Sequence, residues 1–147
     1  MKNGGITIRV AVFADGEAVC VMERAYIGSC WTQQMIDEAI ADDKCLFLVA
    51  EADGRAVGYL SGVFAADECD VSNIAVDESY RRRGIATALF ERLAVGAKER
   101  GASKMFLYVR DDNSAARALY EKIGFAEVGC RKGYYGDADA VVMRRDV

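Results

Sequence analysis

The chain has 147 residues and a net charge of −4 at pH 7, and 52% of its residues are hydrophobic. These values predict one globular domain over residues 1–147, and the acidic balance argues against nucleic acid or an anionic membrane surface as a partner. Histidine is absent, which excludes the usual Ser-His and Cys-His nucleophiles and makes zinc improbable, so no metal site is expected.

The first half of the chain is predicted to form a strand, two helices and three strands. Asp15 and Thr32 stand where helix N-caps are expected, and the dipeptide Asp53-Gly54 is a strong signal for a hairpin turn. Hydrophobic spacing sets the extent of each element. The predicted strands cover about 6–12, 45–50, 56–64 and 69–76, and the predicted helices cover about 16–27 and 33–42.

The second half is predicted to form a helix, a strand, a second helix and two closing strands. Gly84 opens the long helix and Gly101 ends it, while Asn113 or Ser114 caps the second helix, which Gly124 stops. The helices cover about 85–100 and 113–122, and the strands cover about 104–109, 125–132 and 139–145. This order predicts an α/β (α+β) fold with one mixed sheet flanked by helices.

Cysteine usage indicates a reducing compartment. The chain has five cysteines, an odd number, and no pair of them has CxxC spacing. Free thiols of this kind favour the cytoplasm, where most would act as small core residues. No run reaches the roughly 20 apolar residues that cross a bilayer, and no signal-peptide pattern begins the chain.

The run of residues 81–86 (Arg-Arg-Arg-Gly-Ile-Ala) lies between a predicted strand and an amphipathic helix. At a helix start, backbone N–H groups lack internal partners and the helix dipole is positive, so a pyrophosphate can bind there. Gly84 allows a close approach of ligand oxygens, and the arginines add positive charge. The Rossmann and P-loop patterns are absent. The position of this run after a strand favours phosphate binding over a solvated turn.

With these features, the sequence resembles the GNAT acetyltransferase superfamily. The acyl-CoA signature of that superfamily is Arg or Gln, two residues, Gly, one residue, then Gly or Ala, and Arg81, Gly84 and Ala86 match it. Within the superfamily, the chain is similar to the enzymes that acetylate the amino-terminal alanine of ribosomal proteins. The similarity continues through Glu23-Arg24-Ala25, Trp31, Asn73-Ile74-Ala75-Val76, Asn113-Ser114-Ala115-Ala116, residues 119–125 and Tyr134-Tyr135.

The resemblance implies a splayed, mostly antiparallel sheet that opens between the strands at 69–76 and 104–109. The pantetheine arm of acetyl-CoA would lie in that opening, and a backbone N–H there would polarise the thioester carbonyl. The residues implied to bind this co-substrate are Ile74, Ala75, Val76, Arg81, Arg82, Arg83, Gly84, Ile85, Ala86 and Asn113.

The resemblance also implies catalytic roles, with one departure. Tyr120 matches the tyrosine that protonates the leaving CoA thiolate, although a tyrosine packed on the last helix is the simpler alternative. Tyr108 stands where these relatives carry a glutamate base. We therefore expect Asp70 and Tyr108 to hold a water that accepts the amine proton. Asp70 as a solvated carboxylate is an equal alternative, and Glu68 is the next candidate for the base.

The acceptor is expected to be the amino terminus of a protein or peptide. An α-amine has a pKa of about 7.7–8.0 and needs less help from a base than a lysine amine near 10.4. Trp31, Tyr134, Tyr135 and Glu23 would form the acceptor site. Two alternatives are left open, namely that Trp31 is a core residue and that Glu23 is a surface charge. Alternatives are a small amine or lysine acceptor, or a module that binds acetyl-CoA without catalysis. The oligomeric state is left open.

Overall fold

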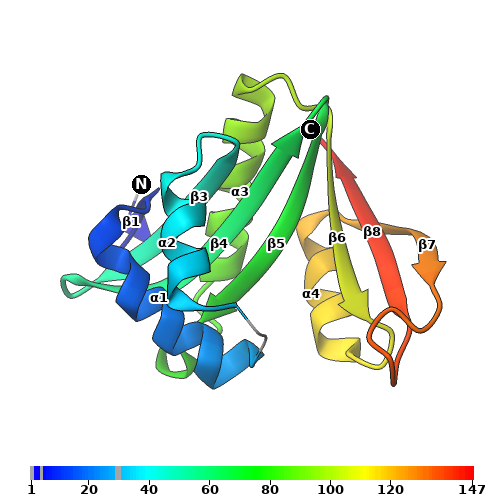
Figure 1. Cartoon of the computed structure of the whole chain (residues 1–147), viewed down its shortest axis with the longest axis horizontal. Coiled ribbons are helices and arrows are strands. Elements are labelled where there is room, and N and C mark those ends of the chain that lie inside the picture. The colour runs from blue at the N-terminus through cyan, green and yellow to red at the C-terminus, as the bar shows by residue number, and fades with distance from the viewer. Residues whose placement is uncertain (1, 4, 29–30) are drawn as a thin grey trace.

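The computed structural model describes residues 2–3, 5–28 and 31–147, so Cys30, one of the predicted thiols, lies outside the described residues. The strands and helices follow the predicted order, with one added strand at the start (Figure 1). The strands are β1 (Lys2–Asn3), β2 (Ile6–Val10), β3 (Cys45–Ala52), β4 (Arg55–Ala65), β5 (Glu68–Val76), β6 (Lys104–Arg110), β7 (Ala126–Arg131) and β8 (Ala140–Asp146). The α-helices are α1 (Gly16–Met22), α2 (Gln33–Ala41), α3 (Ile85–Glu99) and α4 (Ser114–Ile123).

The strands form one eight-stranded sheet in the order β1-β2-β3-β4-β5-β6-β8-β7. Neighbouring strands in this sheet are antiparallel, except β5 and β6, which are parallel. These two strands pair only from Glu68 with Lys104 to Asp70 with Phe106. Beyond these pairs the two strands diverge (Figure 1). The splayed sheet expected from the resemblance is confirmed. The divergence divides the sheet into two arms, one of strands β1–β5 and one of strands β6–β8.

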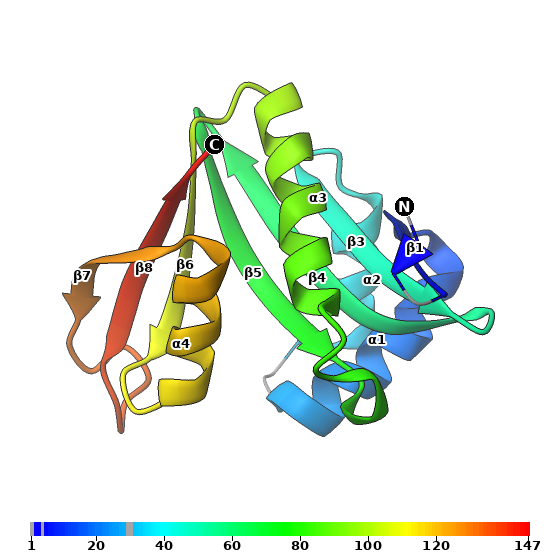
Figure 2. The same cartoon turned by 180° about the vertical axis from the view of Figure 1, so that it is seen from behind.

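Helices cover both faces of the sheet. Helices α1 and α2 lie on one face, and α3 and α4 lie on the other, one on each arm (Figure 2). The predicted apolar face of α3 is buried through Leu89 and Leu93, which pack with strand residues from both arms. On the opposite face, Val19 and Ile36 pack against Phe47. The first core joins the two arms, whereas the second lies on the β1–β5 arm alone.

The ends of the helices follow local chemistry. Thr32 caps α2 as predicted, since its hydroxyl accepts from the Met35 N–H at 3.2 Å. Asp15 precedes α1, but its carboxylate accepts from the Arg9 guanidinium at 2.8 and 2.9 Å instead of capping the helix. The predicted helix over 16–27 is not regular, because α1 passes into a π-helix at Glu23–Ile27. Within the described ranges, no helix combines the length and apolar character needed to span a membrane.

Candidate active site

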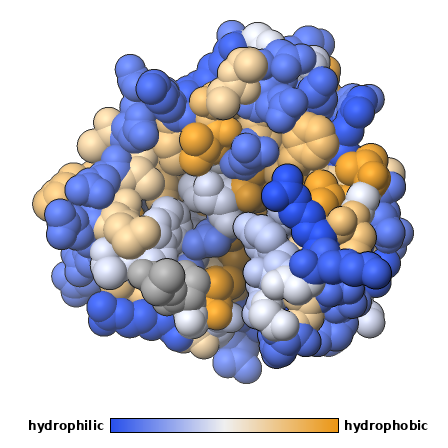
Figure 3. All heavy atoms as spheres, turned by 45° about the vertical axis from the view of Figure 1, so that its right-hand side comes forward, coloured by the Kyte–Doolittle hydropathy of each residue, from blue (hydrophilic) through white to orange (hydrophobic). Residues whose placement is uncertain are grey.

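A cleft of about 760 Å³ follows the opening between β5 and β6. It brings together nearly all of the residues predicted to hold the co-substrate. It is lined by Tyr26, Ile27, Ile74, Ala75, Val76, Tyr80, Arg81, Arg82, Gly84, Ile85, Ala86, Thr87, Asn113, Ala115, Ala116, Leu119, Tyr120 and Lys122. The surface is hollowed between the two arms, and both hydrophobic and hydrophilic residues are visible in and around the hollow (Figure 3).

The N-terminus of α3 opens into this cleft. Gly84 is the N-cap, with a left-handed φ of 77°, and it has no side chain to cap the helix. The first bond of the helix runs from the Ala88 N–H to the Gly84 carbonyl at 3.0 Å. The N–H groups of Ile85, Ala86 and Thr87 therefore precede the intrahelical ladder. This arrangement suits a phosphate group.

Two of the three arginines face the cleft and one does not. Arg81 donates from Nε to the Val76 carbonyl at 3.0 Å, and its guanidinium lies 4.7 Å from the centre of the Tyr26 ring. Arg82 also lines the cleft, whereas Arg83 lines a separate hollow and lies 5.0 Å from the Tyr80 ring centre. The part of Arg83 in binding the co-substrate therefore stays a prediction. The run turns at Arg82, whose φ is 64°, and this turn separates its neighbours.

The left-handed backbone at Gly84 gives a direct test of the α3 terminus. We expect Gly84→Val to raise the KM for acetyl-CoA at least about tenfold, since a β-branched residue is strained at this φ and would crowd the exposed N–H groups. Gly101→Val is the matched control at the other end of α3. Gly101 has a φ of 83°, and its Cβ position meets nothing within 4 Å. Steady-state kinetics with equal KM changes in both variants would contradict a local role for Gly84.

Tyr120 lies on α4 and faces the cleft. Its ring packs edge-on against Phe90 and Phe125, with centroids 5.9 and 6.3 Å away. Burial, followed by the nearby Tyr135 phenol, raises the pKa of Tyr120 above its ordinary value. The phenol therefore stays protonated at neutral pH, as a proton donor requires. Tyr120 is thus packed against its neighbours and also open to the cleft. Its packing on α4 is therefore compatible with a role as proton donor.

Three tyrosines form a continuous aromatic wall on the β6 arm. The Tyr108 and Tyr134 ring centres are 5.0 Å apart, and those of Tyr134 and Tyr135 are also 5.0 Å apart. Arg110, which sequence reasoning missed, anchors this wall because it bonds Asp137 through two contacts of 3.0 Å and lies 5.5 Å from the Tyr135 ring centre. The segment that contains Tyr134, Tyr135 and Asp137 is thus tied to the end of β6.

Asp70 and Tyr108 lie on either side of the point where the sheet opens. Asp70 is opposite Phe106 in the last β5–β6 pair, and Tyr108 is two residues further along β6. Residues two apart on a strand share a face, so both side chains project from the same side of the sheet. Glu68 is opposite Lys104, at the closed end of the pairing. Asp70 is therefore better placed than Glu68 to face the opening.

Glu23 is fully buried, with 0% of its surface exposed, so its interpretation as a surface charge is wrong. Its Oε1 accepts from the Tyr59 hydroxyl and from Nδ2 of Asn73, both at 3.1 Å. Glu23 therefore connects the π-helix that follows α1 to β4 and β5. Trp31 is partly buried, stacks on Phe47 at 5.9 Å, and also lines a second hollow beside β5.

This arrangement of sheet, cleft and helix terminus agrees with comparisons with known proteins. The sequence matches the model of the acetyltransferase (GNAT) family over residues 17–125. The chain belongs to the GNAT family. An N-alpha-acetyltransferase of Mycobacterium tuberculosis is 34% identical over 149 residues, covering 96% of this chain and 92% of that one.

Other GNAT proteins give the same picture. The ribosomal protein bS18 alanine N-acetyltransferase of Escherichia coli is 39% identical over 94 residues, and the match spans 61% of this chain and 64% of that protein. The solved structure of the ribosomal-protein-S18-alanine N-acetyltransferase from Escherichia coli superposes with a TM-score of 0.87 at 30% identity. It covers 97% of this chain and 94% of its own. The GNAT fold is therefore shared along nearly the whole chain.

Within the described residues of this GNAT protein, no group of three or more Cys, Asp or Glu side chains is arranged to hold a metal ion. The residues of the cleft instead offer backbone N–H groups, two arginines and an open strand edge. These features fit a long acyl carrier with a pyrophosphate.

Proposed function

We propose that the chain is an acetyl-CoA-dependent N-acetyltransferase whose acceptor is the amino-terminal α-amine of a protein, with a ribosomal protein as the first class to test. The observation that carries this proposal is the separation of β5 and β6 beside the start of α3, with Tyr120 facing the same cleft. The names of the relatives from Escherichia coli and Mycobacterium tuberculosis support the choice of acceptor.

The cleft supplies a place for each part of acetyl-CoA. The pyrophosphate would meet the N–H groups at the start of α3, with Arg81 and Arg82 adding charge. The pantetheine amides would pair with the open edge of β5 at Ile74, Ala75 and Val76. Asn113 caps α4 with its Oδ1, which accepts from the Ala116 N–H at 3.1 Å. Its amide NH₂ is left to donate to the co-substrate.

In the proposed reaction the neutral amine attacks the thioester carbonyl carbon directly. A C–N bond forms, the C–S bond breaks, and a backbone N–H of β5 stabilises the carbonyl oxygen as its charge grows. The thiolate takes a proton from the Tyr120 hydroxyl, which is reprotonated from solvent. No covalent intermediate with the enzyme is needed. Desolvation raises the pKa of Tyr120 above its ordinary value, so the phenol carries its proton over the whole neutral range.

The proton released by the amine is assigned to a water held by Asp70 and Tyr108. Both side chains project from the same side of the sheet at its opening. An α-amine with a pKa of about 7.7–8.0 is partly neutral near pH 7, so a weak base suffices. Trp31, Tyr134 and Tyr135 would border the acceptor peptide on the two arms.

The acceptor class is tested by incubating the enzyme with acetyl-CoA and a mixed pool of peptides, free lysine derivatives and small amines, followed by mass spectrometry. We expect acetyl groups on peptide amino termini at a rate at least about tenfold above that on lysine side chains, because the two amines differ by more than two pKa units. Preferential modification of lysines or small amines would replace the proposed acceptor. Binding of acetyl-CoA without transfer to any amine would contradict the proposed enzymatic activity.

A further inference from the structure

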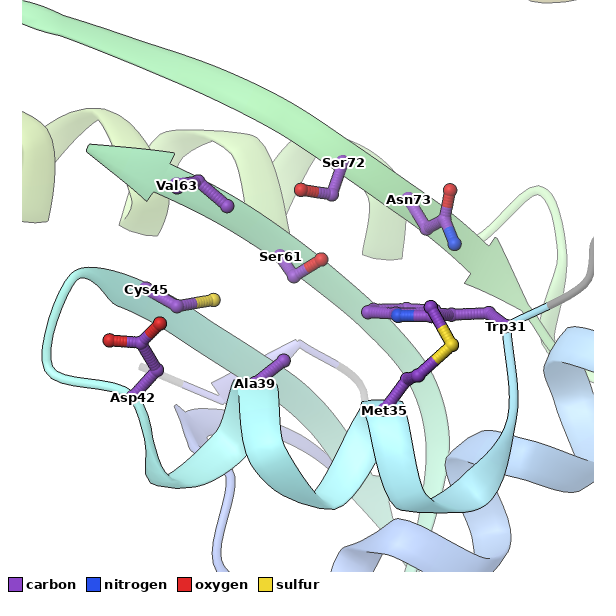
Figure 4. A pocket seen from close by; sticks show the side chains of 9 residues that line it. All are labelled: Trp31, Met35, Ala39, Asp42, Cys45, Ser61, Val63, Ser72 and Asn73. Carbon is purple, nitrogen blue, oxygen red and sulfur yellow. The ribbon is translucent and has the colours of Figure 1, made fainter. Parts of the chain in front are cut away.

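A second hollow, of about 370 Å³, lies on the α1 and α2 face of the sheet. It is lined by Trp31, Met35, Ala39, Asp42, Cys45, Ser61, Val63, Ser72 and Asn73 (Figure 4). Asn73 lines this hollow, and the next residue of β5, Ile74, lines the cleft on the other face. The hollow therefore adjoins the point of acetyl transfer from the acceptor side.

The wall of the hollow is apolar, but its polar groups share one property. Ser61 and Ser72 present hydroxyl oxygens and Asp42 presents a carboxylate, and all of these can accept hydrogen bonds. Asn73 donates through Nδ2 to Glu23, which leaves its Oδ1 as an acceptor. Burial, with Asp42 nearby, raises the pKa of Cys45 to about 11, so its thiol is uncharged. No Lys or Arg is present among the described residues that line the hollow.

One of these groups lacks a partner. Ser61 is 1% exposed, and within the described part of the chain its Oγ has no hydrogen-bond partner. Its hydroxyl points into the hollow between Ser72 and Trp31, while Asp42 lies at the end away from Trp31 (Figure 4). A buried hydroxyl without a partner is costly. A ligand that donates hydrogen bonds would remove that cost.

We infer that this hollow receives a long basic side chain, lysine or arginine, from the first residues of the acceptor, an inference that rests on the proposed function. The methylene stem lies between Trp31 and Met35, and the cationic head meets Ser61 and the carboxylate of Asp42. A glutamate in the same place would bring a second negative charge beside Asp42. The acceptor is therefore a basic amino-terminal segment, which complements the charge of the hollow.

The test compares peptides that carry lysine, norleucine or glutamate at position one, two or three of an otherwise fixed sequence. We expect lysine at one position to raise kcat/KM about tenfold over norleucine and more over glutamate, with the advantage shrinking at high salt. Asp42→Asn removes the lysine advantage. Asp43→Asn, which alters an exposed neighbour outside the hollow, leaves it unchanged.

Ser61→Ala separates binding from stability. The substitution removes an unpartnered hydroxyl, so the melting temperature is expected to stay equal or rise while the lysine advantage falls. Equal use of lysine and norleucine peptides, or an advantage that survives in Asp42→Asn, would overturn the inference and leave the proposed function intact. Calorimetry of the same peptides with the CoA-saturated enzyme makes the comparison without transfer. Absence of transfer with lysine-selective binding would instead contradict the proposed function alone.

Discussion

Replacing Tyr120 with phenylalanine is expected to lower kcat by at least about 100-fold, because general acid catalysis by a positioned side chain contributes about 10²–10⁴ in rate. The hydroxyl is lost, but the ring contacts with Phe90 and Phe125 remain. The affinity for acetyl-CoA and the melting temperature are therefore expected to change little. Stopped or steady-state assays of thiol release, with acetyl-CoA binding measured separately, distinguish chemistry from binding.

Tyr120→Ala is the companion variant, since it removes both the hydroxyl and the ring packing. It is expected to lose stability as well as turnover. The raised pKa of Tyr120 also predicts that the native rate persists at alkaline pH until the pH exceeds the ordinary tyrosine value of about 10. An acid with a raised pKa keeps its proton to higher pH, so the loss appears later. Near-native turnover of the phenylalanine variant would remove Tyr120 from the mechanism.

Replacing Glu23 with alanine is expected to lower the free energy of unfolding more than any of the other single substitutions proposed for this protein. The substitution deprives the Tyr59 hydroxyl and the Asn73 amide of their shared acceptor inside the protein. Leaving one buried and one partly buried donor unsatisfied costs about 2–4 kcal/mol, which lowers the melting temperature of a domain of this size by about 5–15 °C. Transfer should also slow, because Asn73 precedes Ile74 on the strand that borders the cleft.

Glu17→Ala is the matched control, since Glu17 is an exposed glutamate on α1, which leads directly into the π-helix that holds Glu23. Glu23→Gln keeps the shape and one oxygen acceptor, and it should retain most of the lost stability. Thermal melts monitored by circular dichroism give the comparison. If Glu23→Ala and Glu17→Ala melt at the same temperature, the buried contacts carry no net stabilisation.

Much of the fold could be predicted from local patterns. The period of the apolar residues placed α3, the dipeptide Asp53-Gly54 placed the β3–β4 turn, and Thr32 placed the start of α2. The run from Arg81 to Ala86 placed the N-terminus that borders the cleft. These signals depend on neighbouring residues alone, so a single sequence contains them.

The acceptor side could not be predicted in the same way. The buried pairing of Glu23 with Tyr59 joins residues 36 positions apart, so the sequence around Glu23 does not reveal it. A register shift between Ser61 and Gly62 likewise depends on the partner strand β5. Such contacts are decided by tertiary packing. The role of Arg110 was missed for the same reason, since its main partner lies 27 residues away.

The short pairing of β5 with β6 has a thermodynamic consequence. Within the described chain, pairing with β6 ends at Asp70, so from Val71 onward β5 is paired with β4 on one side and has no strand beside it on the side of the opening. A ligand that fills this edge supplies a missing strand, and its binding energy is added to the folding energy by mass action. Saturation at a hundred times Kd contributes about 2.7 kcal/mol. The free energy of unfolding therefore depends on the concentration of co-substrate around the protein.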